Sequence, residues 1–154
     1  MSKPGLDPFA VRLRWRFGEN RPLEVCMATV SEVVESIARR CGEESGYTVG
    51  HIKALATFPD GGFVRASAIS PTRPVDIESG GSPPDYCDEF TVTLAVLVYN
   101  LPYTLARQMV SDAAETAARR HGGCVELSAG PAPLRRSQSH NQDRGDDATE
   151  PHIR

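Results

Sequence analysis

The chain has 154 residues, of which 40% are hydrophobic and 24% charged, and its formal net charge is -3. These are ordinary globular values, and a chain of this length fits one domain that buries roughly 68% of its surface on folding. No apolar run approaches the roughly 18 residues that a membrane helix needs. A mildly acidic chain with 6% aromatic residues also argues against nucleic acid as a partner.

The cysteines and the N-terminus predict the compartment. Four cysteines, widely and irregularly spaced, favour free thiols over a disulfide framework. Cys41 falls on the apolar stripe of an expected helix, and Cys87 is expected to be the most exposed of the four. Residues 1–7 are polar and lack the apolar core of a signal peptide, so we expect a cytoplasmic protein without a membrane partner.

The first expected element is a hairpin. Apolar residues alternate with polar ones over 9–17, and a second alternating run predicts a strand over 23–28 that pairs back after a turn. Three arginines share the exposed face of the first strand: Arg12, Arg14 and Arg16. They form either a patch for an anion or phosphate backbone, or a solvated face with acidic cross-strand partners such as Glu24.

A helix is predicted next. Thr29 and Glu32 have the spacing of a capping box, so the helix should begin at Thr29. Apolar residues then recur at helical spacing, and Gly42 is expected to supply the C-terminal cap.

Residues 47–70 predict a central hairpin, because two β-rich runs flank Pro59-Asp60-Gly61-Gly62, and Asp-Gly is typical of a tight turn. A symmetric loop would pair Phe58 with Phe63. One face would then carry Ile52, Ala54, Ala56, Phe58, Phe63 and Ile69, and the other would carry His51, Lys53, Leu55, Val64, Ala66, Ala68 and Ser70.

The rest of the chain alternates loops with regular elements. The proline-rich stretch 71–88 is expected to be a mobile loop or a lid. Residues 89–99 form the most hydrophobic strand and should be central in the sheet. A second helix over 103–121 and a short strand over 124–128 follow, and the polar tail 131–154 is expected to be disordered.

This order, β-β-α-β-β-β-α-β, predicts an α+β fold. We expect a two-layer sandwich with a mostly antiparallel sheet and two helices on one face, similar to a ferredoxin-like arrangement with an added N-terminal hairpin. A flexible N-terminus, residues 1–8, would precede a single domain over 9–130.

The candidate site lies on the central hairpin. The chain has no P-loop, dinucleotide, zincin or nucleophile-elbow motif. His51 and Lys53 are two residues apart on one strand face, and Arg65 and Ser70 are the expected additional ligand or partner contacts. A half-buried lysine beside an imidazole would have a lowered pKa and act as base or nucleophile, whereas an exposed strand end would make the pair an ordinary surface feature.

A divalent metal is the alternative cofactor. His121 and Cys124 have the spacing H-x-x-C, and imidazole and thiolate suit zinc, cobalt or nickel. A closed structural site needs four ligands, and the sequence offers no second local pair. The other interpretation is that His121 caps its helix and Cys124 packs.

Three runs carry a family resemblance: G-H-I-K-A-L at 50–55, F-V-R-A-S-A after Gly61-Gly62, and L-A-V-L-V-Y-N-L-P-Y-T-L at 94–105. Together they resemble the C-terminal domain of cobalamin-synthesis-type metallochaperone GTPases, over roughly Tyr47 to His121. The chain lacks the P-loop half and its cysteine-rich metal motif. The resemblance therefore implies a stand-alone accessory domain, without GTP hydrolysis or a metal ligand set.

The sequence thus predicts a small accessory domain that binds a protein partner or a small ligand on the sheet face opposite its helices, in metal or cofactor handling. A free sheet edge would favour a homodimer. The alternative is an enzyme that uses His51 and Lys53 beneath a lid formed by 71–88.

Overall fold

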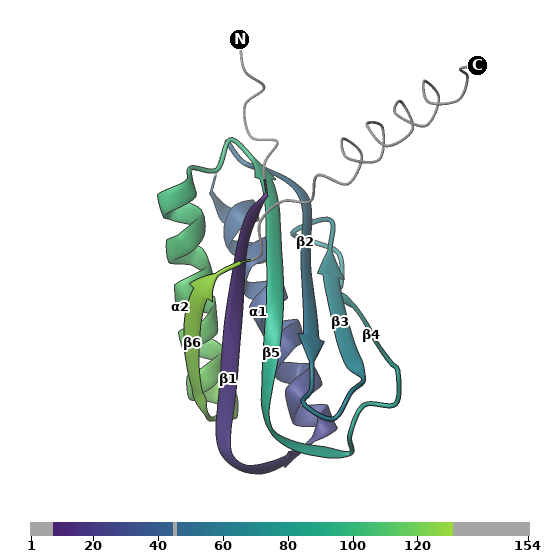
Figure 1. Ribbon diagram of the computed structural model, residues 1–154. Coiled ribbons are helices and arrows are strands. Elements are labelled where there is room, and N and C mark those ends of the chain that lie inside the picture. The colour runs from purple at the N-terminus through teal and green to yellow at the C-terminus, as the bar shows by residue number, and fades with distance from the viewer. Residues whose placement is uncertain (1–7, 45, 131–154) are drawn as a thin grey trace, which may run out of the picture.

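The computed structural model describes residues 8–44 and 46–130 (Figure 1). The elements are β1 (Phe9–Pro22), α1 (Leu23–Glu43), β2 (Thr48–Thr57), β3 (Phe63–Ala68), β4 (Asp76–Gly80), β5 (Tyr86–Tyr99), α2 (Tyr103–His121) and β6 (Cys124–Ala129). The predicted flexible N-terminus, apart from residue 8, and the predicted disordered tail lie outside the described residues.

The six strands form one sheet in the order β4-β3-β2-β5-β1-β6, and every neighbouring pair is antiparallel. Both helices pack on the same face of this sheet (Figure 1). This arrangement confirms the predicted α+β two-layer sandwich, with β5 in the interior of the sheet as expected. Within the described residues, no helix is both long and apolar enough to cross a membrane.

The order of the elements differs from the prediction at two points. The chain runs β-α-β-β-β-β-α-β, because the expected second strand is part of α1 and the proline-rich stretch contributes β4. Strands β6, β1, β5 and β2 with the two helices have ferredoxin-like connectivity. The extra strands β3 and β4 therefore extend the β2 edge, and there is no added N-terminal hairpin.

Residues 23–28 are helical, and the prediction of a strand there is wrong. Alternation over six residues is too short to separate a period of 2 from a period of 3.6. The longer pattern decides, because Cys26 and Val30 are buried on the same helical stripe as the residues that follow. Thr29 is inside the helix and does not cap it, since its Oγ1 donates a hydrogen bond to the carbonyl oxygen of Val25 at 2.7 Å.

The core lies between the sheet and the helices and contains an aromatic cluster. Trp15 and Phe90 are buried and stack with ring centroids 5.9 Å apart. The rings of Phe17 and Phe58 lie 5.8 and 5.9 Å from Phe90. The Trp15 Nε1–H donates to the carbonyl oxygen of Gly122 at 3.3 Å, which joins β1 to the end of α2.

The register of the β2–β3 hairpin differs by one residue from the symmetric prediction. Thr57 pairs with Phe63, and Phe58 lies in the loop, where its carbonyl oxygen accepts the N–H of Gly61 at 3.0 Å. Because Thr57 pairs with Phe63, the loop has an odd number of residues, and two of them, Gly61 and Gly62, have positive φ. The shift exchanges the two faces of β3: Val64, Ala66 and Ala68 are buried, and Arg65 and Ser67 lie on the open face beside Lys53.

The stretch 71–88 is not a structureless lid. Its residues 76–80 form β4, which pairs with β3 in the plane of the sheet, and β5 begins at Tyr86. Pro71 contacts α1, because a Cβ atom on Gly42 would lie 2.4 Å from the Pro71 Cβ. The helix runs past Gly42 to Glu43, so the prediction of Gly42 as its C-terminal cap is wrong.

Candidate functional site

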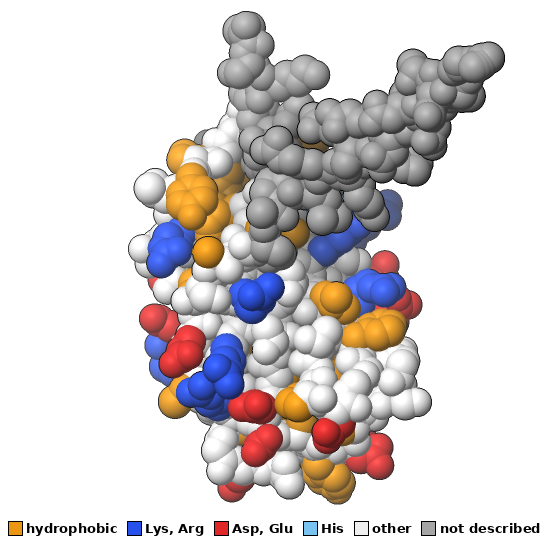
Figure 2. Space-filling model, viewed as in Figure 1, with side chains coloured by type: hydrophobic (Ala, Val, Ile, Leu, Met, Phe, Trp, Pro, Cys, Tyr) orange, Lys and Arg blue, Asp and Glu red, His pale blue; other side chains and the backbone are white. Residues whose placement is uncertain are grey.

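The candidate site is the face of the sheet opposite the helices. No described helix covers this face, and Figure 2 shows both basic and acidic side chains on it, with uncharged surface between them. Its centre is β5, whose Thr91, Thr93 and Ala95 are half-buried. These residues pair with Arg14, Arg12 and Ala10 on β1 and with Thr57, Leu55 and Lys53 on β2.

Short side chains on β5 therefore have Arg12 and Arg14 beside them on β1 and Leu55 and Lys53 beside them on β2, with the short residues Ala10 and Thr57 as further neighbours. We name this strip of short side chains the β5 trough: its floor is Thr91, Thr93 and Ala95, and its rims are Arg12 and Arg14 on β1 and Lys53 on β2. The rims are two strand spacings apart, about 10 Å. The strip between them follows one strand, β5, along its length.

The cations on this face of the sheet differ in whether an acidic side chain pairs with them. Arg16 lies 4.0 Å from Glu126 on β6, and Arg65 forms an ion pair with Glu78 on β4. Glu24, the predicted cross-strand partner of the arginine row, is in the first turn of α1 instead. Arg12, Arg14 and Lys53 form no ion pair with another described residue. Among the described residues of β1, β2 and β5, these three cations are the ones without an ion-pair partner.

A depression lies at the β3–β4 edge of the same face. It is an open hollow of about 670 Å³ whose lining includes Lys53, Arg65, Ser67, Asp76 and Glu78. The structure therefore brings two of the predicted site residues, Lys53 and Arg65, to one place. Ser67 was not among the predicted site residues, and it lies on this face because it pairs with Lys53 in the observed register.

His51 lies on the same face as Lys53, since Ile52 between them points into the core. It pairs with Leu97 of β5 after an irregularity between Val49 and His51. Its Nδ1 is buried and has no hydrogen-bond partner among the described residues. Burial, and secondarily the charge of Lys53, lowers the pKa of His51, which favours a neutral imidazole at neutral pH.

Ser70 does not join this group. It follows the end of β3, where its Oγ accepts the backbone N–H of Thr72 at 3.2 Å. The hollow that it lines is a different one of about 320 Å³, bounded by Glu35 and Arg39 of α1. The predicted set of four contacts is therefore divided between two sides of the molecule.

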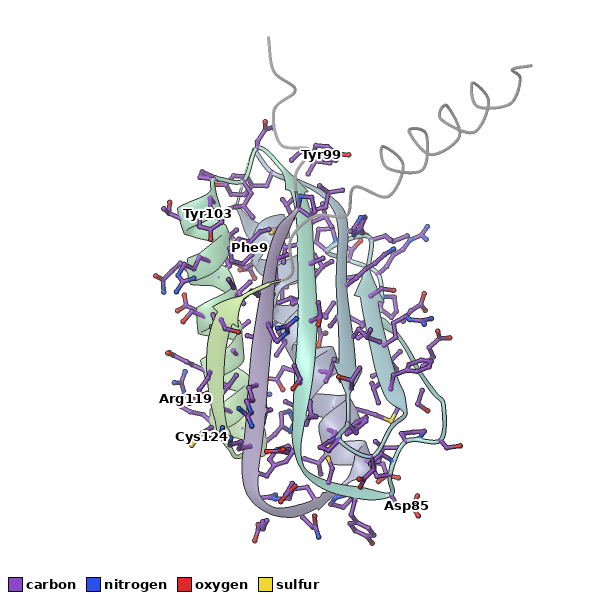
Figure 3. The ribbon with its side chains drawn as sticks, in the orientation of Figure 1. Phe9, Asp85, Tyr99, Tyr103, Arg119 and Cys124 are labelled. Carbon is purple, nitrogen blue, oxygen red and sulfur yellow. The ribbon has the colours of Figure 1, made fainter. Side chains whose placement is uncertain are left out.

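The predicted metal pair is also divided. The ring Nε2 of His121 is 2.7 Å from Glu32 Oε1 on α1, so His121 links the two helices. Cys124 is exposed and pairs with Arg16 at the β6 edge (Figure 3). Among the described residues there is no group of three or more His, Cys, Asp or Glu side chains placed to hold a metal ion.

The other cysteines are buried. Cys41 packs in the core as expected, but the prediction that Cys87 is the most exposed is wrong. Its side chain points into the core from the start of β5, and its Sγ is 2.8 Å from Sγ of Cys26. Asp88 does disfavour the thiolate as predicted, although burial is the main reason that the pKa of Cys87 is raised.

Comparisons of the chain with protein-family models, with curated proteins and with solved structures found no match. The resemblance to the metallochaperone C-terminal domain therefore stays a prediction. What the molecule can do has to be inferred from the open face itself.

Proposed function

We propose that this protein is a binding protein that receives an extended, acidic segment of a protein partner in the β5 trough. The observation that carries the proposal is the placement of three cations without described ion-pair partners, Arg12, Arg14 and Lys53, on both sides of a floor of short side chains. Opposite charge on the partner would guide its approach and fix its register along β5.

The shape of the face favours an extended chain over a small molecule. Small-molecule sites are concave and enclose most of their ligand, whereas the strip of short side chains runs along β5 between two neighbouring strands. Nucleic acid fits less well, because Glu89 and Glu126 flank the arginine row and the floor offers threonine and alanine in place of aromatic stacking surfaces.

The test is fluorescence anisotropy with a labelled peptide of alternating Glu and Val. Alternate residues of an extended peptide face the trough, so this peptide presents one row of carboxylates. We expect binding that weakens at least about tenfold, or 1.4 kcal/mol, in the variant Arg12→Gln/Arg14→Gln/Lys53→Gln. A control away from this face is Arg119→Gln, which removes one exposed charge from α2 on the other layer.

Three outcomes would overturn the proposal. The first is equal binding of a Gln-Val peptide, which lacks the charge. The second is unchanged binding by the triple variant. The third is tighter binding of single-stranded oligothymidylate at physiological salt, which would assign the arginine row to phosphate contacts. A dimer in native mass spectrometry that the triple substitution dissociates would instead identify a second copy of this chain as the occupant.

A role in metal or cofactor handling rests on the family resemblance alone. Elemental analysis of the purified protein tests it, and a stoichiometric zinc, cobalt or nickel content would support it.

We also propose the cytoplasm as the compartment of this protein, because four free thiols are typical of a reducing environment. Fractionation of cells that express the tagged chain tests this placement.

An enzyme that uses His51 and Lys53 is the second candidate function. It is favoured by the buried, unpartnered Nδ1 and the lowered pKa of His51, because a neutral imidazole can accept a proton. Hydrolysis of p-nitrophenyl acetate above the buffer rate, abolished by His51→Ala, would support it. A rate equal to that of the His51→Ala variant would count against it.

A further inference from the structure

We propose that Cys26 and Cys87 form a reversible intramolecular disulfide that ties the first turns of α1 to the start of β5. The two residues are 61 positions apart in the sequence, and their sulfur atoms are 2.8 Å apart in the core. A disulfide bond has a length of about 2.05 Å, so its formation needs the two sulfurs to approach by less than about 1 Å.

The backbone around both residues is already held in place. Arg21 pairs with Cys87 and Pro22 with Tyr86 across the β1–β5 ladder. The N–H of Leu23, the first residue of α1, donates to the carbonyl oxygen of Asp85 at 2.8 Å, at the end of the molecule marked by Asp85 in Figure 3. Closing the bond therefore demands a small adjustment of the side chains and no rearrangement of the fold.

The reaction is a thiol–disulfide exchange with a low-molecular-weight disulfide, RSSR, as the oxidant. The Cys87 thiolate attacks one sulfur of RSSR, which breaks the S–S bond and releases RS⁻. The Cys26 thiolate then attacks the Cys87 sulfur of this mixed disulfide and displaces the second RS⁻. The two protons lost by the cysteines end on the two RSH products, so two thiols are oxidised and one disulfide is reduced.

Burial makes this exchange slow. Cys26 is fully buried and Cys87 nearly so, and burial together with the facing Cys87 sulfur raises the pKa of Cys26 far above its ordinary value. Cys87 follows Tyr86, whose side chain is exposed, and the short segment that joins β4 to β5. We therefore place the entry of the oxidant at a local opening of that segment.

The other two cysteines lack such a partner. Cys41 is equally buried, but its nearest sulfur is the Met109 thioether at 3.8 Å, which cannot form a disulfide. Cys124 is exposed at the β6 edge. Cys41 therefore serves as an internal control for burial, and Cys124 has to be removed because it would react with the oxidant from outside.

In a reducing cell the pair would remain as two thiols, and oxidative conditions would convert it into a covalent brace. Cross-linking a 61-residue loop removes unfolded-chain entropy. We expect the oxidised protein to melt about 10 °C higher than the reduced protein, from the usual scaling of loop entropy and melting temperature.

The test uses the full chain with Cys124→Ser, incubated at pH 8.5 with oxidised glutathione and then denatured and alkylated. We expect the titratable thiols to fall from three to one, a mass loss of about 2 Da, and a peptide that links Cys26 to Cys87. The remaining alkylated thiol should be Cys41. Dithiothreitol should restore all three thiols and the lower melting temperature.

Stable glutathione adducts, three free thiols after full exposure to the oxidant, or a link that includes Cys41 would overturn the proposal. Cys87→Ser added to Cys124→Ser is the matched variant, and in it the thiol count should stay at two with no rise in melting temperature. Cys26→Ala provides the same test from the helix side, so the proposal does not depend on the folding of a single variant.

Discussion

For the substitution Gly42→Ala, helix propensity and packing predict opposite changes in the free energy of unfolding. Gly42 is the last residue but one of α1, and in a helix alanine is better than glycine by up to about 1 kcal/mol. A Cβ atom at this position would lie 2.4 Å from Cβ and 2.9 Å from Cγ of Pro71. Because such contacts are too close for two carbon atoms, either α1 or the segment that carries Pro71 has to move.

The magnitude follows from these two effects. Insertion of a methyl group into a packed site costs about 1–3 kcal/mol, and the gain in helix propensity offsets about 1 kcal/mol of it. We therefore expect Gly42→Ala to lower the free energy of unfolding by about 1 kcal/mol. In a Pro71→Gly background the atom nearest to the added Cβ is the Cα of residue 71 at 3.9 Å, which is an ordinary contact. There the same substitution should raise the free energy of unfolding by about 0.5–1 kcal/mol.

The assay is urea unfolding followed by the fluorescence of Trp15, which is the single tryptophan of the chain and is fully buried. The four proteins of the double-mutant cycle give the interaction energy between positions 42 and 71 directly. Stabilisation of the wild-type background by Gly42→Ala, or an interaction energy within about 0.5 kcal/mol of zero, would refute the predicted contact.

Three further results are expected. His51 should titrate in NMR with a midpoint below 6.5, and Lys53→Met should restore only part of the shift, because burial is its larger cause; a wild-type midpoint at or above 6.5 would contradict this. Arg40 lowers the pKa of Asp112, so this ion pair contributes stability at neutral pH that is lost as the pH falls below about 4. Asp112→Asn should therefore reduce the loss of stability on the acidic side of a stability–pH curve. An unchanged acidic side of the curve would exclude the pair. Phe90→Ala should cost about 3–5 kcal/mol in urea unfolding, and a loss below 1 kcal/mol would contradict its place in the aromatic cluster.

The fold class was predictable because long periodic segments define it. Residues 9–17, 89–99 and 103–121 each show one clear period, and each is the element that was expected. The prediction of a strand over 23–28 was wrong because the alternation there is short, whereas the helical apolar stripe continues through the residues that follow. Residues 76–80 were missed as a strand because prolines and acids mark an edge strand as well as a loop.

The candidate site was predictable in part. Lys53 and Arg65 were named from the hairpin sequence, and both line the hollow on the open face. The length of the turn between β2 and β3 decides that Ser67, and not Ser70, lies at the site. Asp60 and the glycines after it do not determine this length. The Cys26–Cys87 contact joins elements 61 residues apart, and no local pattern contains that information.

Strands β3 and β4 are inserted between β2 and β5, which are themselves direct neighbours in the sheet. Thr57 at the end of β2 pairs with Thr91 of β5, so a tight turn between them would leave the four other strands in their order. Evolution can therefore widen or narrow the sheet at this edge without rethreading the chain. We expect homologues to diverge first here, in the number of strands beyond β2, and thus in the breadth of the sheet face opposite the helices.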